Sequence, residues 1–323
     1  MNRGRISVGQ MVILLYISRI FTAMTFAPQY TKDANATAAL LGIAISVLVD
    51  CIVLIPAFLL YRRMRRGNVI DACYNTMGRG GGVVYSVFYS LFFFFAALST
   101  LNQFTFFMSS AIFPNTSVIY LLITFLAVVL YASYLGIEGL ARFSTLVFVG
   151  FLIALAFILT ALAASNNMQT LYLRGLLYNG WKPLFGAISQ NITRNLELVA
   201  LLFIAPIAKG NKTAGYIVWL LLFSATFELI AFIILSTLGD YATLQLFPFY
   251  TSSIVAEFSI FERLDALHMG IWVFMATVKT VFYVLLTRRC LVYLIPAKAK
   301  KFVPAGICVL LGVIGFVFAT NLE

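Results

Sequence analysis

Six charged residues of this 323-residue chain lie inside long apolar stretches, and three of them are basic and three acidic. A charged side chain at the centre of a bilayer costs on the order of 3 kcal/mol, so such residues face a protein interior or a water-filled path and pair with other polar groups. Equal numbers of each sign favour internal pairing. The set therefore predicts a buried polar centre made from Arg19, Asp50, Arg194, Glu197, Glu228 and Lys279.

Lys279 is the most unusual member of this set. It lies about 21 Å of helix below Asp265 and about 13 Å above Arg288, at 1.5 Å per residue. One interpretation is a lysine whose long stem reaches the membrane surface. The other is an ammonium group that replaces a coupling sodium ion or exchanges protons. The charges at Glu262, Arg263 and Asp265 mark the water boundary at the outer start of this span.

One face of this span is the predicted wall of a cavity. Residues three and four apart share a helix face, which places Trp272, Ala276, Lys279 and Tyr283 together. The single histidine, His268, stands at the outer start of the same span. We expect it to be a surface residue and not a proton relay.

Polar residues interrupt two apolar segments, the first and the sixth. Ser18, Arg19 and Thr22 lie halfway along the first segment. The sixth segment is denser, and its polar residues within eight positions are Gln190, Asn191, Thr193, Arg194, Asn195 and Glu197. Both segments are predicted to be discontinuous helices whose freed backbone groups line a cavity. An alternative places 181–194 outside the membrane and leaves a span of about 12 residues from Leu196, which is too short to cross.

The bulk composition identifies the class of protein. The chain is 62% hydrophobic and 10% charged, with a mean hydropathy of +1.00, whereas a soluble domain carries about 25% charged residues. Apolar runs recur along its whole length, so the prediction is an all-α polytopic membrane protein. Nine spans are expected, at 8–28, 36–60, 82–108, 117–136, 142–163, 183–207, 213–238, 265–287 and 303–320.

Orientation follows from the basic residues, because cytoplasmic loops carry an excess of Lys and Arg. With the N-terminus inside, fifteen of the 22 basic residues fall in inner loops. Four fall in outer loops, at Lys32, Arg174, Lys182 and Arg263, and three lie within spans. The asymmetry predicts a cytoplasmic N-terminus. It also explains the net charge of +11 without nucleic acid.

Several connecting segments have predicted roles. The segment VIDACYNTMGRGGG is expected on the inner surface, separated from the third span by Gly80 to Gly82. Glu138 and Arg142 stand four residues apart in a structural connector. The stretch 239–265 is expected to contain a short amphipathic helix on the outer side. The four cysteines show no metal spacing and are interpreted as apolar filler.

The first and sixth segments occupy corresponding positions, which favours an inverted-repeat transporter fold in a single domain, 1–323. Repeat one covers about 8–163 and repeat two about 181–320. Helix ends at the membrane midplane offer N–H groups to a carboxylate and C=O groups to a cation, so an amino acid zwitterion fits. We find no nucleotide-binding loop, metal-ligand cluster or nucleophile–base motif, and predict neither an enzyme nor a cofactor.

The motifs along the chain resemble the spore-germination permease family, the B subunits of GerA-type germinant receptors, within the amino acid–polyamine–organocation superfamily. Two blocks are fairly specific together, the YLGIEGLAR block at 134–142 and the ERLDA–W block within FERLDALHMGIWVF at 261–274. The weaker pieces are ISVGQM, FPNT at 113–116, LYLRGLLYNGWKPLFGAI at 171–188 and LGDYATLQLFPFY at 238–250.

This resemblance implies a ten-helix, LeuT-like fold in the inner membrane of an endospore, in a complex with A and C subunits. It implies a pocket for a small, amino-acid-like germinant built from Ser18, Thr22, Tyr89, Gln190, Asn191, Asn195 and Tyr283, beside Glu197 and Lys279. Two departures stand out. The first span has SRIFTA where the family has a glycine, and the chain shows nine spans, so the tenth is missing by nature or by truncation.

Three functions are compatible with these features. The first is a nutrient-sensing subunit of a germination receptor. The second is a proton-coupled amino acid transporter that acts alone. The third is a structural subunit that only holds its A and C partners. Sensing and transport need the same cavity, so the sequence leaves them open.

Overall fold

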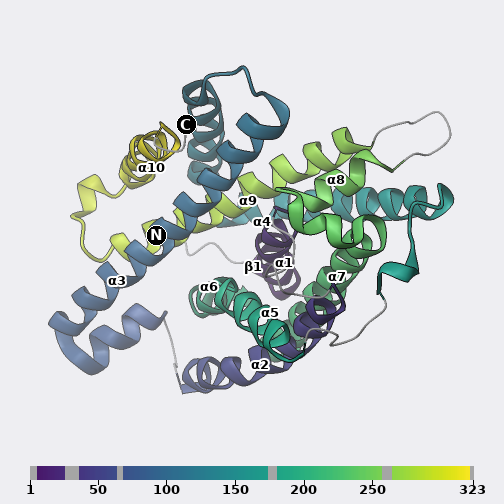
Figure 1. The fold of residues 1–323 in the computed structure, drawn as a ribbon. Helices are drawn as coiled ribbons and strands as arrows, with labels where there is room; N and C mark the ends of the chain where they lie inside the picture. The colour runs from purple at the N-terminus through teal and green to yellow at the C-terminus, as the bar shows by residue number, and fades with distance from the viewer. Residues whose placement is uncertain (1–5, 26–35, 64–67, 174–179, 257–263, 321–323) are drawn as a thin grey trace.

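The computed structural model of the chain describes residues 6–25, 36–63, 68–173, 180–256 and 264–320. Helices dominate these residues, because hydrocarbon offers no partner to backbone polar groups and a helix satisfies them within one segment. Figure 1 shows long helices packed across one another at several angles. They are α1 (Val8–Thr25), α2 (Ala36–Arg63), α3 (Val69–Phe107), α4 (Val118–Ala164), α7 (Lys212–Leu238), α9 (Asp265–Leu291) and α10 (Val303–Thr320).

Short elements connect these helices. The short α-helices are α5 (Lys182–Thr193), α6 (Glu197–Ile204) and α8 (Pro248–Ile254). One π-helical turn is η1 (Met108–Ile112), and the 3-10 turns are η2 (Thr170–Leu173), η3 (Ala205–Ile207), η4 (Gly239–Leu244) and η5 (Ala297–Ala299). The two strands are β1 (Ile6–Ser7) and β2 (Ala208–Lys209). The prediction of a short helix within 239–265 is confirmed by α8. The charges at Glu262 and Arg263 lie outside the described residues.

Within the described ranges, seven helices are long and apolar enough to cross a bilayer, so the protein is an all-α polytopic integral membrane protein. One of them, α4, has 47 residues and thus about 70 Å of helix measured along its axis, more than twice the hydrocarbon thickness of about 30 Å. Its backbone leaves the helical conformation at Gly136, where φ is 76° and ψ is −173°. Gly136 closes the predicted fourth span, so α4 has the length and the bend for two crossings.

The predicted sixth span is discontinuous, as its polar centre indicated. The helix α5 ends at Thr193 and α6 begins at Glu197. Neither helix is long enough to cross a membrane alone, but together they extend from Lys182 to Ile204. Because α5 packs along α2, the alternative in which 181–194 is a separate surface helix is not supported.

The prediction of a broken first span is wrong. The helix α1 is continuous from Val8 to Thr25, and its midpoint at Ser18 and Arg19 has helical backbone. The physical reason is that this segment contains neither glycine nor proline at its centre. Its polar side chains find partners on α5, α6 and α9, so the backbone does not have to open to satisfy them.

The break before the third span also differs from the prediction. The segment 69–77 joins the rest of α3 through a single bend at Gly78 (φ 71°, ψ −169°), two residues before the predicted glycines. A capping box between Asn68 and Asp71 starts this segment. The Tyr293 hydroxyl, just beyond α9, donates to Asp71 Oδ1 at 2.6 Å, and burial raises the pKa of Tyr293.

A short parallel pairing relates distant parts of the chain. Ile6 pairs with Ala208 and Ser7 with Lys209, and the two strands lead into α1 and α7. These two helices therefore start at the same end of the molecule and pack on each other. An even number of crossings, with α1 itself included, must therefore lie between the start of α1 and the start of α7. This condition is met when α4 crosses twice and α5 with α6 crosses once, which supports the nine-span prediction.

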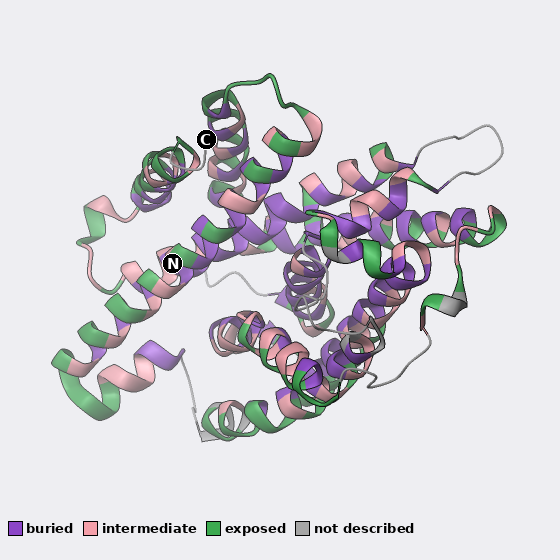
Figure 2. Ribbon diagram, in the orientation of Figure 1, coloured by how far each residue is buried: buried purple, intermediate pink, exposed green. Residues whose placement is uncertain are grey.

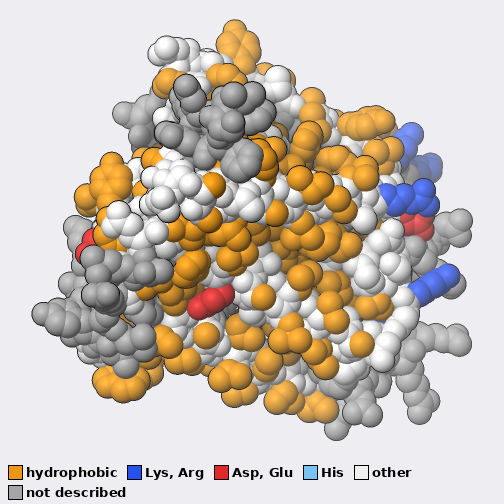
Figure 3. Space-filling model, turned by 90° about the vertical axis from the view of Figure 1, so that its right-hand side faces the viewer, with side chains coloured by type: hydrophobic (Ala, Val, Ile, Leu, Met, Phe, Trp, Pro, Cys, Tyr) orange, Lys and Arg blue, Asp and Glu red, His pale blue; other side chains and the backbone are white. Residues whose placement is uncertain are grey.

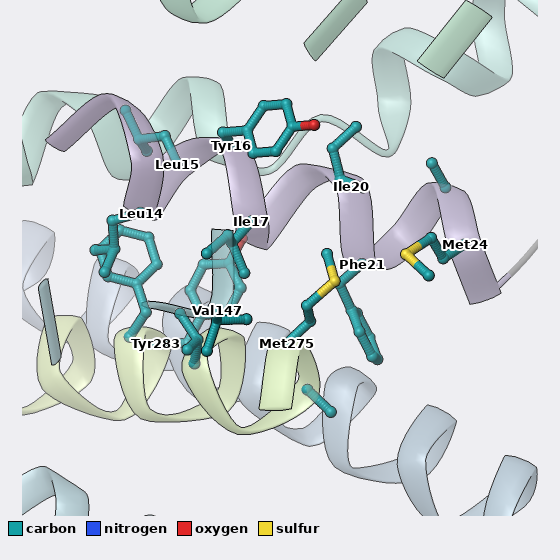
Figure 4. Close-up of a cluster of buried hydrophobic side chains, with 14 of the residues drawn as sticks. Leu14, Leu15, Tyr16, Ile17, Ile20, Phe21, Met24, Val147, Met275 and Tyr283 are labelled. Atoms are coloured by element: carbon teal, nitrogen blue, oxygen red, sulfur yellow. The ribbon is translucent and has the colours of Figure 1, made fainter. Parts of the chain in front are cut away.

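The core lies around α1 and α9. In these helices 78% and 67% of the spanning residues are buried, compared with 28% to 50% in the other five. Figure 2 shows this concentration of buried residues, and Figure 4 shows Ile17 and Phe21 of α1 facing Met275 and Tyr283 of α9. In contrast, Figure 3 shows a broad outer face of hydrophobic side chains with few charges, as expected of a surface in contact with lipid.

Candidate ligand site at the α5–α6 break

The site is built on the interruption between α5 and α6. The last four carbonyl groups of a helix lack partners within the helix, and its carboxyl end attracts cations, whereas its amino end attracts anions. Here the guanidinium of Arg19 reaches the carboxyl end of α5, and Glu197 is the first residue of α6. Each end of the interrupted segment therefore has a charge of the favourable sign.

The first group of polar residues, which we term the lysine cluster, consists of Ser18, Thr22, Glu197, Lys279 and Tyr283. Lys279 Nζ donates to the backbone oxygen of Ser18 at 2.8 Å and to Thr22 Oγ1 at 2.6 Å, and lies 3.3 Å from Glu197 Oε1. An ammonium group has three N–H donors, so all of its donors are matched.

Glu197 is the second centre of the lysine cluster and is fully buried. Its Oε1 atom accepts from Ser18 Oγ at 2.6 Å and from the Tyr283 hydroxyl at 3.0 Å, in addition to the contact with Lys279. Its Oε2 atom has no partner among the described residues. The cluster thus joins α1, α6 and α9 through a buried ion pair.

The second group, which we term the arginine cluster, consists of Arg19, Ser46, Asp50, Asn191 and Asn195. Arg19 Nη2 donates to the backbone oxygen of Asn191 at 2.9 Å and also to its side-chain Oδ1. Arg19 Nη1 donates to the backbone oxygen of Arg194 at 3.1 Å. The Asn191 amide donates to Ser46 Oγ. Asn195 Nδ2 donates to Asp50 Oδ2 at 2.9 Å. This cluster joins α1, α2 and the α5–α6 break.

The arginine cluster contains several buried atoms without a hydrogen-bond partner in the described part of the chain. They are Arg19 Nε, Asp50 Oδ1 and Asn195 Oδ1, and Gln190 Oε1 lies nearby in sequence. A buried polar atom left unsatisfied costs about 1–3 kcal/mol, so such atoms require a ligand, water or a functional explanation. One of these atoms is a donor and the others are acceptors.

Aromatic rings surround both cations. The Arg19 guanidinium lies 5.8 Å from the ring centre of Phe223 and 5.4 Å from that of Phe227. Lys279 Nζ lies 5.6 Å from the ring centre of Phe21 and 5.8 Å from that of Tyr283. Cation–π contacts of this kind favour a charged side chain in a site that excludes water.

The structure brings together most of the predicted site residues. Ser18, Thr22, Lys279 and Tyr283 meet Glu197, and the predicted face of α9 is buried, with Trp272 Nε1 donating to Thr25 Oγ1 at 2.9 Å.

The side chains of three other predicted residues make none of the polar contacts described for the two clusters. Tyr89 contributes its ring, whose centre lies 4.9 Å from the ring centre of Phe203. Arg194 contributes its backbone oxygen to the arginine cluster. Glu228 belongs to neither cluster.

The prediction of a surface position for His268 is wrong. Its side chain is 1% exposed and packs among the rings of Phe107, Phe249 and Tyr250. Neither ring nitrogen has a partner among the described residues. The reason is that α8 folds back over the start of α9, an arrangement that the position of the histidine in the sequence does not reveal.

Ser46 was not singled out from the sequence, although it accepts from Asn191 inside the arginine cluster. A signal was available, because Ser46 and Asp50 are four residues apart and share one face of α2. Serine is common in membrane helices, so this spacing alone does not identify Ser46 as a site residue.

A comparison with protein-family models places the chain among known proteins. A family model described as "Spore germination protein" matches residues 5–323, which is nearly the whole chain. No curated protein matches the sequence. The family match agrees with the resemblance in the GIEGLAR and ERLDA–W blocks. The chain therefore belongs to the spore-germination permease family.

Proposed function

We propose that this protein is a nutrient-sensing subunit of a spore germination receptor and that the arginine cluster binds an amino-acid-like zwitterion. The observation that carries the proposal is the set of unpartnered buried atoms beside the α5–α6 break, with a donor at Arg19 Nε and acceptors at Asp50 Oδ1 and Asn195 Oδ1. A zwitterion supplies the complementary groups. Its carboxylate accepts from the arginine, and its ammonium donates to the two acceptors.

The lysine cluster has a different role in this proposal. All three donors of Lys279 are matched, so the cluster holds α1, α6 and α9 together. The adjacent α5–α6 break is then the part of the site that changes when the ligand binds. Ligand contacts to Asp50 and Asn195 would change the separation of α2 and the α5–α6 segment, which Asn195 now joins. That displacement is the signal that we propose passes to partner subunits.

The wider setting follows from family membership. We propose a LeuT-like architecture of the family type with nine crossings in this chain, a cytoplasmic N-terminus and a position in the spore inner membrane, in complex with A and C subunits. Family membership and the interrupted sixth span support this setting. No enzymatic activity is proposed.

Ligand binding is tested by thermal unfolding of the purified full chain with each of the twenty amino acids in turn. A ligand that binds only the folded state at 100 times its Kd adds about 2.7 kcal/mol of stability. We expect one or a few amino acids to raise the Tm, and Asp50→Asn to remove this shift. Thr193→Ala is the matched control, because Thr193 bonds within α5 and is exposed. No shift with any amino acid would reject the ligand class.

Sensing and transport are separated by uptake into proteoliposomes. A sensing subunit binds the amino acid without accumulating it, whereas a transporter accumulates it in response to a proton gradient. Uptake by this chain alone, abolished by Lys279→Ala, would replace the sensing proposal with the transport one. In spores, a deletion strain screened against individual amino acids should lose the response to the same compound that raises the Tm.

A further inference from the structure

Glu228 is the one buried-charge candidate that neither polar cluster uses. It lies in α7, about 24 Å of helix from Lys212 and about 15 Å from Leu238 at 1.5 Å per residue. A glutamate stem is too short to carry its carboxylate over either distance to water. The carboxylate is therefore at hydrocarbon depth, where an unpaired charge costs on the order of 3 kcal/mol.

The position of Glu228 around α7 is on the outward side. The helix packs on α1 through residues such as Gly215, which lies against Val8, and Thr226, which accepts from the Tyr16 hydroxyl. On the opposite side, Ile217 is 54% exposed and Leu221 is 63% exposed, and Ala225 is exposed as well. Steps of four, four and three residues join Ile217 to Glu228 through these positions, so all four lie on one stripe. We term the set of Ile217, Leu221, Ala225 and Glu228 the α7 stripe.

The carboxylate on this stripe is half-buried and incompletely satisfied. Glu228 Oε2 is shielded from solvent and has no hydrogen-bond partner in the part of the chain that the structure describes. Lipid tails surrounding the stripe provide no donor. Glu228 as a whole is half-buried, so its exposed part faces the outside of the bundle, where a donor on another molecule would stabilise the carboxylate.

We propose that the α7 stripe docks a transmembrane helix of a different protein that carries a lysine or arginine at the depth of Glu228. Charge complementarity selects this partner, since a basic side chain neutralises the carboxylate from the exposed side of Glu228. Ile217 and Leu221 supply apolar contact, and the small side chain of Ala225 lets a second helix approach closely. The inference does not depend on the ligand site, because Glu228 belongs to neither cluster, although the neighbouring Phe227 ring lies 5.4 Å from the Arg19 guanidinium.

A second copy of this chain is a poor match for the same surface. Its basic residues at this depth are engaged inside the bundle, with Arg19 3% exposed, Lys279 4% exposed and Arg194 half-buried with contacts of its own. A two-fold pair through α7 would bring the same surface patch of each copy together, and hence two carboxylates.

Photo-crosslinking of the full chain in its native membranes tests the proposal. A benzoylphenylalanine replaces Leu221 on the stripe or, as the control, Leu146, which is 72% exposed on α4. We expect one discrete protein adduct from position 221 and none from position 146. The second variant adds Glu228→Leu, which should reduce the adduct about tenfold, whereas Glu228→Asp should retain it.

The outcomes are distinct. An adduct that maps to a membrane segment with a lysine or arginine, and that depends on Glu228, supports the proposal. Adducts to lipid only, to a second copy of this chain, to a segment without a basic residue, or unchanged by Glu228→Leu would each overturn it. Thermal unfolding of the Glu228→Leu chain verifies that the variant is folded, and its Tm should stay within about 2 °C of that of the unmodified chain.

Discussion

The lysine cluster and the arginine cluster lie on adjacent residues of α1, yet they are satisfied to different degrees. In the first, Ser18, Thr22 and Glu197 match every donor of Lys279. In the second, Arg19, Asp50 and Asn195 each retain an unmatched buried atom among the described residues. The lysine cluster leaves one such atom, at Glu197 Oε2. We infer that the first cluster stabilises the bundle and the second is available for a ligand.

The difference has a simple cause in the direction of the side chains. Lys279 reaches across from α9 to the backbone and side chains of α1, where several acceptors lie within one helical turn. Arg19 instead extends toward the end of α5, whose carbonyl groups occupy its two terminal nitrogens and leave Nε free. A lysine is a compact charge that nearby acceptors can satisfy completely, whereas the planar guanidinium has donors that diverge.

The largest expected effect is that of Lys279→Met. Removing one partner of a buried ion pair leaves the other charge uncompensated and costs about 3–5 kcal/mol. We expect a correspondingly large fall in the Tm of the purified chain. The double variant Lys279→Met with Glu197→Gln should recover most of this loss, since it removes both charges. If the single variant is as stable as the original chain, the lysine cluster has no structural role.

Tyr283→Phe should have the next largest effect. The variant keeps the buried ring but removes the hydroxyl that donates to Glu197 at 3.0 Å. A hydrogen bond to a charged group contributes about 1.5–3 kcal/mol, so we expect a loss of about 2 kcal/mol in the free energy of unfolding. Tyr89→Phe is the matched control, because its ring packs on Phe203 and should retain this contact. Equal effects at the two tyrosines would contradict the assignment.

Asp50→Asn should affect the response to the ligand while leaving the stability of the chain nearly unchanged. The amide of the new asparagine presents an oxygen that can still accept from Asn195, so the free energy of unfolding should change by about 1 kcal/mol or less. The ligand-dependent rise in Tm should nevertheless disappear, because the negative charge facing the ligand ammonium is gone. A variant that loses stability as severely as Lys279→Met would show that both clusters are structural.

His268→Phe should change stability in the opposite direction. The ring nitrogens of His268 lack partners among the described residues, and the neighbouring rings are those of Phe107, Phe249 and Tyr250. Replacing an unsatisfied buried polar group with an apolar one of similar shape is neutral or stabilising, so we expect a gain of up to about 1 kcal/mol. A loss of ligand response in this variant would show that unmatched buried atoms outside the arginine cluster also serve the ligand.

The features that follow from local composition were predictable from the sequence. The dense polar run from Gln190 to Glu197 indicated the interrupted sixth span, and the depth of Lys279 in an apolar segment indicated a buried charge. Both are properties of one segment. The all-α membrane class follows in the same way from the repeated apolar runs.

Features that depend on how helices rotate against one another were not predictable. The partner of Lys279 is Glu197 and not Asp50 or Glu228, and this choice is fixed only when α1, α6 and α9 meet. Similarly, the first span contains polar residues as a broken helix would, but it stays continuous because other helices supply partners for Ser18 and for the terminal nitrogens of Arg19. His268 is buried by α8, a segment more than ten residues away in sequence.

The parallel pairing of β1 with β2 holds one end of α1 in place more firmly than the pairing alone can hold the rest of the helix. Backbone hydrogen bonds fix the beginning of α1 to the exit of α6, and the absence of a side chain at Gly215 lets α7 approach Val8 closely at the same end. Ser18 and Arg19 stand about 17 Å up α1 from this pivot, at 1.5 Å per residue. A small rotation of α1 about its tied end would therefore displace Ser18 and Arg19 more than it displaces the residues near Ser7. Because Arg19 is hydrogen-bonded to the α5–α6 break, a ligand bound there under the proposed function would push on α1 far from its tied end, where a given force turns the helix more effectively than it would near Ser7.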